Sequence, residues 1–108
     1  MYIIKVGGGS KINLEGVVAD LATLEKPYVV VLGANALRDD LAGRLGQEKV
    51  ELTSVSGYTS VYSDVEAIDL IMMAYSGLKN RRFVELCQRN GINAVGLTGL
   101  DGRLIQGR

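Results

Sequence analysis

A lysine lies inside an apolar run near the start of the chain, and three glycines follow it directly. Residues 3–6 read Ile-Ile-Lys-Val, which is typical of a buried strand in a parallel sheet, and Gly7, Gly8 and Gly9 come next. A glycine-rich turn between a strand and a helix exposes N–H groups that bind phosphate, and a nearby lysine supplies the positive charge that phosphoryl transfer needs. We interpret Lys5 and the three glycines as the centre of an anion site. The alternative is a lysine that extends into solvent beside a flexible turn.

A second unit of the same kind follows. Residues 28–32 form another apolar, valine-rich run, and Gly33, Ala34 and Asn35 lead from it into a helical pattern. Turns that follow neighbouring parallel strands lie at the same end of the sheet. We therefore expect the two turns to face one crevice.

The elements that must position these turns can be predicted from spacing. Asn13 is a plausible N-cap, and apolar residues at intervals of three and four predict a helix to about Glu25, which Pro27 stops. A second helix is predicted over about 36–45, with Gly46 as its C′ residue.

The second half of the chain continues the alternation. We expect a short strand at 50–53 and a loop or small hairpin at 54–63, after which Ser63 and Glu66 have the spacing of a capping box with Ser63 as N-cap. The later expectations are a helix broken at Gly77, a helix over about 78–89, a strand at 93–97, and an Asp101-Gly102 hairpin turn with a return strand from Leu104. This order predicts a three-layer α/β/α domain with a mainly parallel sheet.

Composition excludes several kinds of chemistry. The 108 residues contain no histidine and one cysteine, so histidine-based catalysis, an internal disulfide and a cysteine-rich zinc site are excluded within them. Cys87 reads as a core or near-core residue, because no base is available to activate it as a nucleophile. The net charge is zero, which gives no support for nucleic-acid or membrane partners, and we expect a cytoplasmic location.

The glycines match neither of the common nucleotide-binding motifs. Ile12 stands where the dinucleotide fingerprint has its third glycine, and no Gly-Lys-Ser/Thr follows the first turn. Instead, the chain resembles the amino acid kinase family. The residues that carry the resemblance are Lys5-Val6-Gly7-Gly8, the valine-rich run into Gly33, Tyr62-Ser63-Asp64, Asn80, and the run from Ala94 to Gly102. The similarity is greatest to the carrier-protein-linked aminoadipate or glutamate kinases of lysine and arginine biosynthesis, and next to N-acetylglutamate kinase.

This resemblance implies phosphoryl transfer from ATP, accompanied by Mg²⁺, to a side-chain carboxylate. Lys5 matches the family's transition-state lysine, Gly7, Gly8 and Gly9 would hold phosphate oxygens, and residues 33–35 match the loop that holds the acyl substrate. Residues 1–108 correspond to the N-terminal, acyl-substrate-binding part of a family member. Because the C-terminal part holds most of the ATP site, we expect these residues to transfer no phosphate alone.

Three departures from the family pattern affect this expectation. Leu32 stands where relatives usually carry histidine, and Ala34 and Asn35 replace two glycines. Val61 occupies the position of the arginine that binds the substrate's α-carboxylate, and valine offers no such pairing. A truncated, non-catalytic module that binds a partner or self-associates is therefore the alternative from another functional class.

Two surfaces are candidates for partners. Lys79, Arg81, Arg82 and Arg89 form a basic cluster, which is either a solvated helix face or, as the resemblance implies, a docking patch for a small acidic amino-group carrier protein. The helix over 64–76 has a wide apolar side that suits either a homodimer or burial within the monomer.

Overall fold

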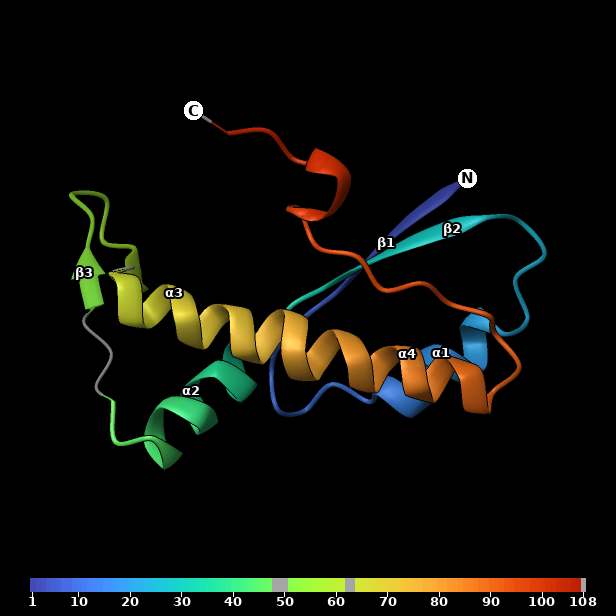
Figure 1. Ribbon diagram of the computed structural model, residues 1–108, viewed down its shortest axis with the longest axis horizontal. Coiled ribbons are helices and arrows are strands. Elements are labelled where there is room, and N and C mark those ends of the chain that lie inside the picture. The colour runs from blue at the N-terminus through green and yellow to red at the C-terminus, as the bar shows by residue number, and fades with distance from the viewer. Residues whose placement is uncertain (48–50, 62–63, 108) are drawn as a thin grey trace.

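The structure is a computed structural model that describes residues 1–47, 51–61 and 64–107 (Figure 1). Its first half contains β1 (Tyr2–Val6), α1 (Leu14–Leu21), β2 (Tyr28–Leu32) and α2 (Asn35–Arg44). Its second half contains β3 (Glu51–Thr53), β4 (Thr59–Val61), α3 (Val65–Met72), the π-helix η1 (Met73–Lys79), α4 (Asn80–Arg89) and the short 3-10 helix η2 (Asp101–Arg103). The chain thus combines helices with a parallel strand pair, as an α/β fold requires.

Strands β1 and β2 pair in parallel, with Lys5 opposite Val31 and Val6 opposite Leu32. Alternate residues along the pair face opposite sides, as the strand period requires. Ile4, Val30 and Leu32 belong to the side that packs against the helical core. The side that carries Ile3, Val29 and Val31 stays exposed, so a helical layer on each face of the sheet remains a prediction.

The core lies between this strand pair and helices α1 and α4. Its buried members are Val18, Leu21, Phe83 and Cys87. Cys87 is only 2% exposed, and burial raises the pKa of its thiol, which confirms the reading as a core residue and keeps it protonated at neutral pH.

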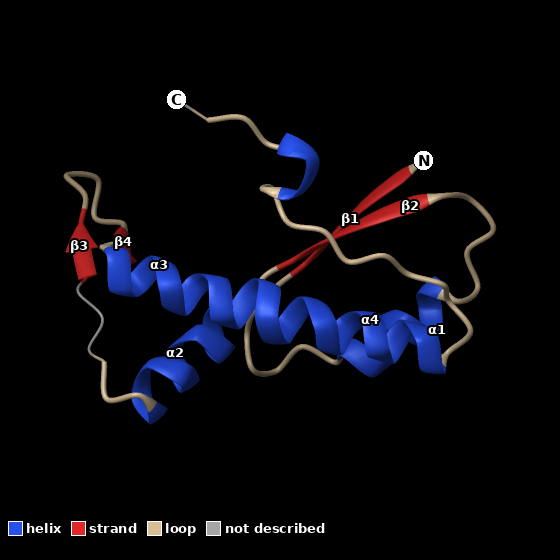
Figure 2. Ribbon diagram, viewed as in Figure 1, coloured by secondary structure: helices blue, strands red, loops and turns tan. Residues whose placement is uncertain are grey.

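One long helical rod runs from Val65 to Arg89 and crosses the whole view (Figures 1 and 2). The prediction of a break at Gly77 is wrong, because the rod passes through it as the π-helix η1. Within η1 the N–H of Asn80 donates to Tyr75 O, five residues earlier. A Cβ added at Gly77 would have one atom within 4 Å, Met72 O at 3.9 Å. Gly77 therefore lies inside a continuous helix and does not form a turn.

Predicted helix boundaries agree with the structure at some ends and not at others: α4 ends at Arg89 as expected but begins at Asn80, two residues after the expected start. Asn13 caps α1 as expected, since its side chain accepts from Gly16 N at 3.0 Å, but α1 ends at Leu21 rather than near Glu25. The N-cap of α3 is Asp64, whose carboxylate accepts from Ala67 N at 2.8 Å. The predicted N-cap, Ser63, lies outside the described residues. Asp64 therefore caps the helix, one residue after the N-cap that the sequence predicts.

The predicted strand at 93–97 does not form. Residues 92–98 are irregular, and their carbonyls are bound by helix side chains instead of a neighbouring strand: Arg81 donates to Gly96 O at 3.0 Å and Asn80 to Leu97 O at 3.1 Å. A strand needs a ladder partner, and the structure supplies none to this segment within the described residues. The hairpin at Asp101-Gly102 and its return strand are also wrong, because these residues form η2.

The small hairpin expected after residue 53 is present as the antiparallel pair β3–β4, a sheet separate from β1–β2. It lies at the α3 end of the rod (Figure 2). In the part of the chain that the structure describes, no helix is long and apolar enough to cross a membrane.

Candidate functional site

The two glycine turns meet backbone to backbone at the carboxyl ends of β1 and β2. Gly33 N donates to Val6 O at 2.9 Å, and Ala36 N donates to Gly8 O at 3.0 Å. The first bond continues the strand ladder by one residue, and the second fastens the first turn onto the first turn of α2. The two turns therefore lie side by side at one end of the strand pair, as parallel topology predicts, and the crevice that they were expected to face stays a prediction.

Close approach, rather than an unusual backbone angle, explains the glycines at this contact. A Cβ on Gly8 would lie 2.6 Å from both Asn35 N and Gly33 C, and closer still to Ala34 N; one on Gly33 would lie 2.7 Å from Gly8 N. Real Cβ atoms do not approach backbone atoms so closely, so no other residue type fits. Neither glycine has a positive φ. Ala34 adopts φ −145° and is fully buried, so its side chain is accommodated without strain.

Several N–H groups remain unused around this contact. The backbone N–H groups of Gly8, Gly9, Ala34 and Asn35 donate to no other described residue. Those of Ala34 and Asn35 stand at the N-terminus of α2, where the helix dipole adds partial positive charge. Ala34 is buried, Gly8 is half-buried and Gly9 and Asn35 are exposed, so an anion can reach these groups, and oxygen anions are natural ligands of such N–H groups. The turns thus offer the donors that a bound phosphate or carboxylate would need.

Lys5 lies one residue before Val6 in β1, next to the contact between the turns. Its side chain is exposed and belongs to the sheet side opposite Ile4 and Val6. It has no ion pair with any residue that the structure describes. The structure therefore leaves a cation available beside the two turns, which is compatible with either of the readings given above for Lys5.

The remaining candidate residues divide between this site and other elements. Leu32 is half-buried against the core, so its side chain serves packing. Val61 is the last residue of β4, in the separate hairpin, and its side chain is outside the described part of the structure. The site as described thus consists of Lys5, residues 7–9 and residues 33–35.

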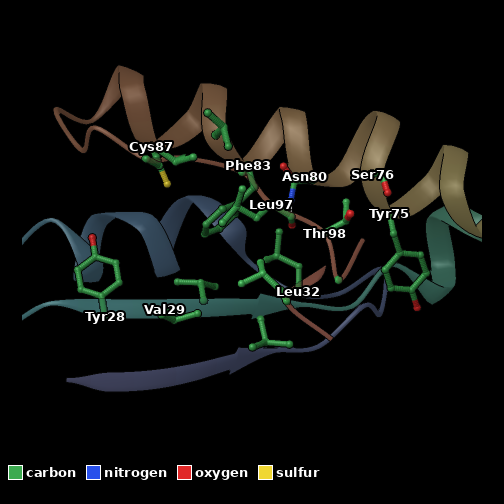
Figure 3. A pocket seen from close by; sticks show the side chains of 18 of the residues that line it. Tyr28, Val29, Leu32, Tyr75, Ser76, Asn80, Phe83, Cys87, Leu97 and Thr98 are labelled. Atoms are coloured by element: carbon green, nitrogen blue, oxygen red, sulfur yellow. Dashed lines mark hydrogen bonds between the residues drawn. The ribbon is translucent and has the colours of Figure 1, made fainter. Parts of the chain in front are cut away.

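A mainly apolar cleft of about 830 Å³ runs along β2 beneath α4 (Figure 3). Its other wall is the irregular segment 92–99. Tyr28 lies near one end and Tyr75 near the other, where Ser76, Asn80 and Thr98 add polar groups. The polar end is the end of Leu32, and β2 leads from there into the second glycine turn.

The basic cluster is partly engaged within the molecule. Arg81 holds Gly96 O, and Arg82 pairs with Glu85 at 3.2 Å. Lys79 and Arg89 make no ion pair with the described residues, but they lie at opposite ends of α4. Arg81 thus ties α4 to the segment at Gly96, whereas the Arg82–Glu85 pair lies at the surface within one helix and contributes little to stability.

Helix α3 presents an exposed apolar stripe. Val65, Ile68 and Met72 follow one another at spacings of three and four and are 76%, 47% and 48% exposed. Ile71 and Tyr75, the other apolar residues of this side, are half-buried, so the side is partly covered within the monomer. An exposed helical stripe of this kind suits a partner surface.

Two side-chain contacts were not predicted from the sequence, and one of them lies at the site. Tyr75 belongs to the helix predicted over 64–76, and its hydroxyl donates to Asn35 Oδ1 at 2.9 Å. Asp101 was assigned to a hairpin turn, whereas its carboxylate accepts from Thr98 N at 2.7 Å and from Thr98 Oγ1 at 3.1 Å. These two hydrogen bonds lower the pKa of Asp101. The Thr-x-x-Asp spacing indicates the Thr98–Asp101 contact, but no local sequence pattern indicates the contact between Tyr75 and Asn35.

Comparison with known proteins first identifies the class of proteins to which this chain is similar. No family model matches the chain. Curated relatives match it over all or nearly all of its length, and their names are those of kinases of LysW-linked aminoadipate or glutamate. The resemblance seen in the motifs is thereby confirmed.

Among these relatives, the LysW-aminoadipate kinase of Thermus thermophilus is 43% identical over 111 residues, which cover 100% of this chain and 41% of that protein. The enzyme of the same name from Deinococcus radiodurans is 40% identical, with 100% and 38% covered. The LysW-aminoadipate/LysW-glutamate kinase of Saccharolobus islandicus is 35% identical over 106 residues, with 97% and 40% covered. The chain thus spans about two-fifths of the length of the curated relatives it matches.

Proposed function

We propose that this chain is the acyl-substrate-binding part of a kinase that phosphorylates a side-chain carboxylate. The acceptor is a carrier-linked 2-aminoadipate or glutamate, and the product is an acyl phosphate. The proposal transfers to this chain what the names of its relatives state of them. It includes a sheet covered by helices on both faces and an ATP site whose larger part lies outside these 108 residues.

The observation that carries the proposal is the contact between the two glycine turns. It brings the unpaired N–H groups of Gly8, Gly9, Ala34 and Asn35 to one edge of the sheet, beside Lys5. Acyl-phosphate formation brings two anionic groups together, so a site for it needs donors and a cation more than it needs an acid or base. The absence of histidine is compatible with that requirement.

Each part of the site has a distinct role in this proposal. The N–H groups of the first turn, residues 7–9, hold phosphate oxygens, and those of residues 33–35 hold the acceptor. Lys5 offsets the negative charge that grows on the group in transfer. ATP, with its Mg²⁺, supplies the phosphoryl group when bound. The contribution proposed for this chain is the N–H donors and the cation named above.

Val61 bears on recognition of the acceptor. A free amino acid derivative presents an α-carboxylate that calls for a cation, and valine at this position offers none. When the acceptor arrives on a carrier protein, recognition is shared with the carrier's surface. An acceptor linked to its carrier through the amino group keeps its α-carboxylate, so Val61 does not separate it from N-acetylglutamate. The names of the relatives favour the carrier-linked acceptor, and N-acetylglutamate remains the second candidate within the same class.

Lys79, Arg81, Arg82 and Arg89 together would attract an acidic carrier, because Arg81 keeps its positive charge while it donates to Gly96 O and the Arg82–Glu85 pair is exposed to solvent. The exposed stripe on α3 supports a homodimer as well as a non-catalytic, self-associating module. Sedimentation of the protein before and after Ile68→Asp tests the dimer: the wild type should sediment as a dimer and the variant as a monomer. A monomeric wild type would contradict it.

The function is tested by trapping acyl phosphate with hydroxylamine in the presence of ATP and each candidate acceptor. We expect product from the intact gene product with the carrier-linked acceptors and none from the 108-residue chain alone. Lys5→Ala should lower kcat by about 100- to 1,000-fold while changing KM little, because a transition-state contact is lost. Product from free N-acetylglutamate at the higher rate would reassign the acceptor. Absence of product with every acceptor would overturn the kinase function.

A further inference from the structure

We infer that Tyr75 is a positioning residue that orients the Asn35 side chain as a hydrogen-bond donor to the acceptor carboxylate. This inference rests on the proposed function for its ligand, but the Tyr75–Asn35 contact itself belongs to the structure. Tyr75 lies in η1, forty residues along the chain from Asn35, which opens α2. The two residues join the helical rod to the second glycine turn.

In this structure the Asn35 carboxamide is held with its Oδ1 toward the Tyr75 hydroxyl. Oδ1 of an asparagine can only accept, so Tyr75 must be the donor across the 2.9 Å between them. The Nδ2 group, with two N–H donors, is then directed away from Tyr75. It makes no hydrogen bond to another described residue, and Asn35 is exposed. Two side-chain donors are thus presented to solvent beside the unpaired backbone N–H of the same residue.

The π-helix explains why a tyrosine of the rod reaches this turn. A π-turn holds one more residue than an α-turn, so it rotates the side chains that follow relative to those before. Ala74 is fully buried on the core side while the adjacent Tyr75 contacts α2. π-Helical turns are costly and are found most often at functional sites. Here the π-helical turn places the Tyr75 hydroxyl against the Asn35 carboxamide.

The donors of Asn35 suit the acceptor better than the nucleotide. The first turn carries its own unpaired N–H groups at Gly8 and Gly9, whereas Asn35 lies on the second turn and is bound to Tyr75, which lines the polar end of the apolar cleft. An acceptor has the matching character, since an aliphatic chain ends in a carboxylate. A carboxylate oxygen accepts from an amide N–H₂ group, and an amide turned the other way would present Oδ1 and repel it.

The first test does not depend on activity. In ¹⁵N-labelled protein, Tyr75→Phe should shift the Asn35 side-chain N–H₂ signals, because Oδ1 loses its hydrogen bond and the carboxamide is no longer held. Tyr28→Phe is the matched control, since Tyr28 lies at the far end of the cleft and its hydroxyl has no hydrogen bond to a described residue. Equal effects of the two changes, or none from Tyr75→Phe, would overturn the positioning role whether or not the protein is a kinase.

The second test uses the intact gene product and separates KM from kcat. Tyr75→Phe should raise KM for the acceptor about three- to tenfold, the usual worth of one hydrogen bond, with kcat and KM for ATP nearly unchanged. Asn35→Asp should raise it further, because the carboxylate still accepts from Tyr75 but offers no donor. In an Asn35→Ala background Tyr75→Phe should have no further effect, since the two residues act as one unit. Additive effects, or a fall in kcat alone, would contradict the inference and leave the proposed kinase function standing.

Discussion

Two glycine-bearing regions of this chain are built by different means. In the first, the turns at Gly8 and Gly33 touch through backbone atoms, with no side chain between them. In the second, the segment around Gly96 is held to the helical rod by the side chains of Asn80 and Arg81. A backbone contact cannot yield to an added methyl group, whereas a side chain can rotate away. Glycine is therefore required in the first region, whereas a larger residue can replace it in the second.

The largest stability effect should follow from Gly8→Ala. Its Cβ would overlap backbone atoms of Gly33, Ala34 and Asn35, which can separate only if β1 and α2 move apart. We expect a loss of about 1–3 kcal/mol in the free energy of unfolding, the usual range for overpacking. Urea unfolding followed by circular dichroism measures it.

Gly9→Ala is the matched control, because nothing lies within 4 Å of a Cβ at Gly9 and its φ is not positive. It should change stability by no more than about 0.5 kcal/mol. If Gly8→Ala is as harmless as Gly9→Ala, the turns do not touch in solution as described here.

Gly96→Ala should have a smaller effect. Its Cβ would meet the Asn80 carboxamide and, at 3.0 Å, a methyl group of Val84, all side-chain atoms that can shift. The expected cost is about 1 kcal/mol, mainly the hydrogen bond from Asn80 to Leu97 O. The same unfolding experiment measures it, and a loss larger than that of Gly8→Ala would reverse the comparison between the regions.

The smallest effect concerns pH and the Thr98–Asp101 turn. The pKa of Asp101 is lowered by hydrogen bonds from Thr98, so its stabilisation is present above the ordinary aspartate pKa and is lost as pH falls through the folded value. The Thr98 amide signal should therefore titrate with a midpoint below that of an ordinary aspartate. In Asp101→Asn this titration should be missing. A midpoint at or above the ordinary value would show that the turn is open in solution.

The first region could be predicted from sequence because its signals are local. A valine-rich run, glycines at its end and Asn13 at a helix start each report on the few residues around them. The second region could not, since a strand at 93–97 depends on a partner elsewhere, and Asn80 and Arg81 take the carbonyls that a partner would bind. Gly77 misled for a related reason: the π-helix through it is stabilised by tertiary packing, which outweighs the local preference for a break.

The candidate site was predicted only in part. The approach of the two turns was expected from parallel topology, but the reason for their glycines was not, since backbone overlap is visible only in three dimensions. Tyr75 could not be assigned to the site, because its direction depends on the π-helical register. The roles of Lys5 and of residues 7–9 and 33–35 remain proposals.

Titration of ¹⁵N-labelled protein with inorganic phosphate, followed by NMR against a sodium chloride control, tests the central claim most directly. If the two turns form an anion site, added phosphate should shift the amide signals of Gly8, Gly9, Ala34 and Asn35 until the shifts saturate. The amide signals of Gly96 and Gly99 should keep their positions. Lys5→Ala should weaken the phosphate binding. Shifts that do not saturate, or that are equal in both regions, would contradict the account.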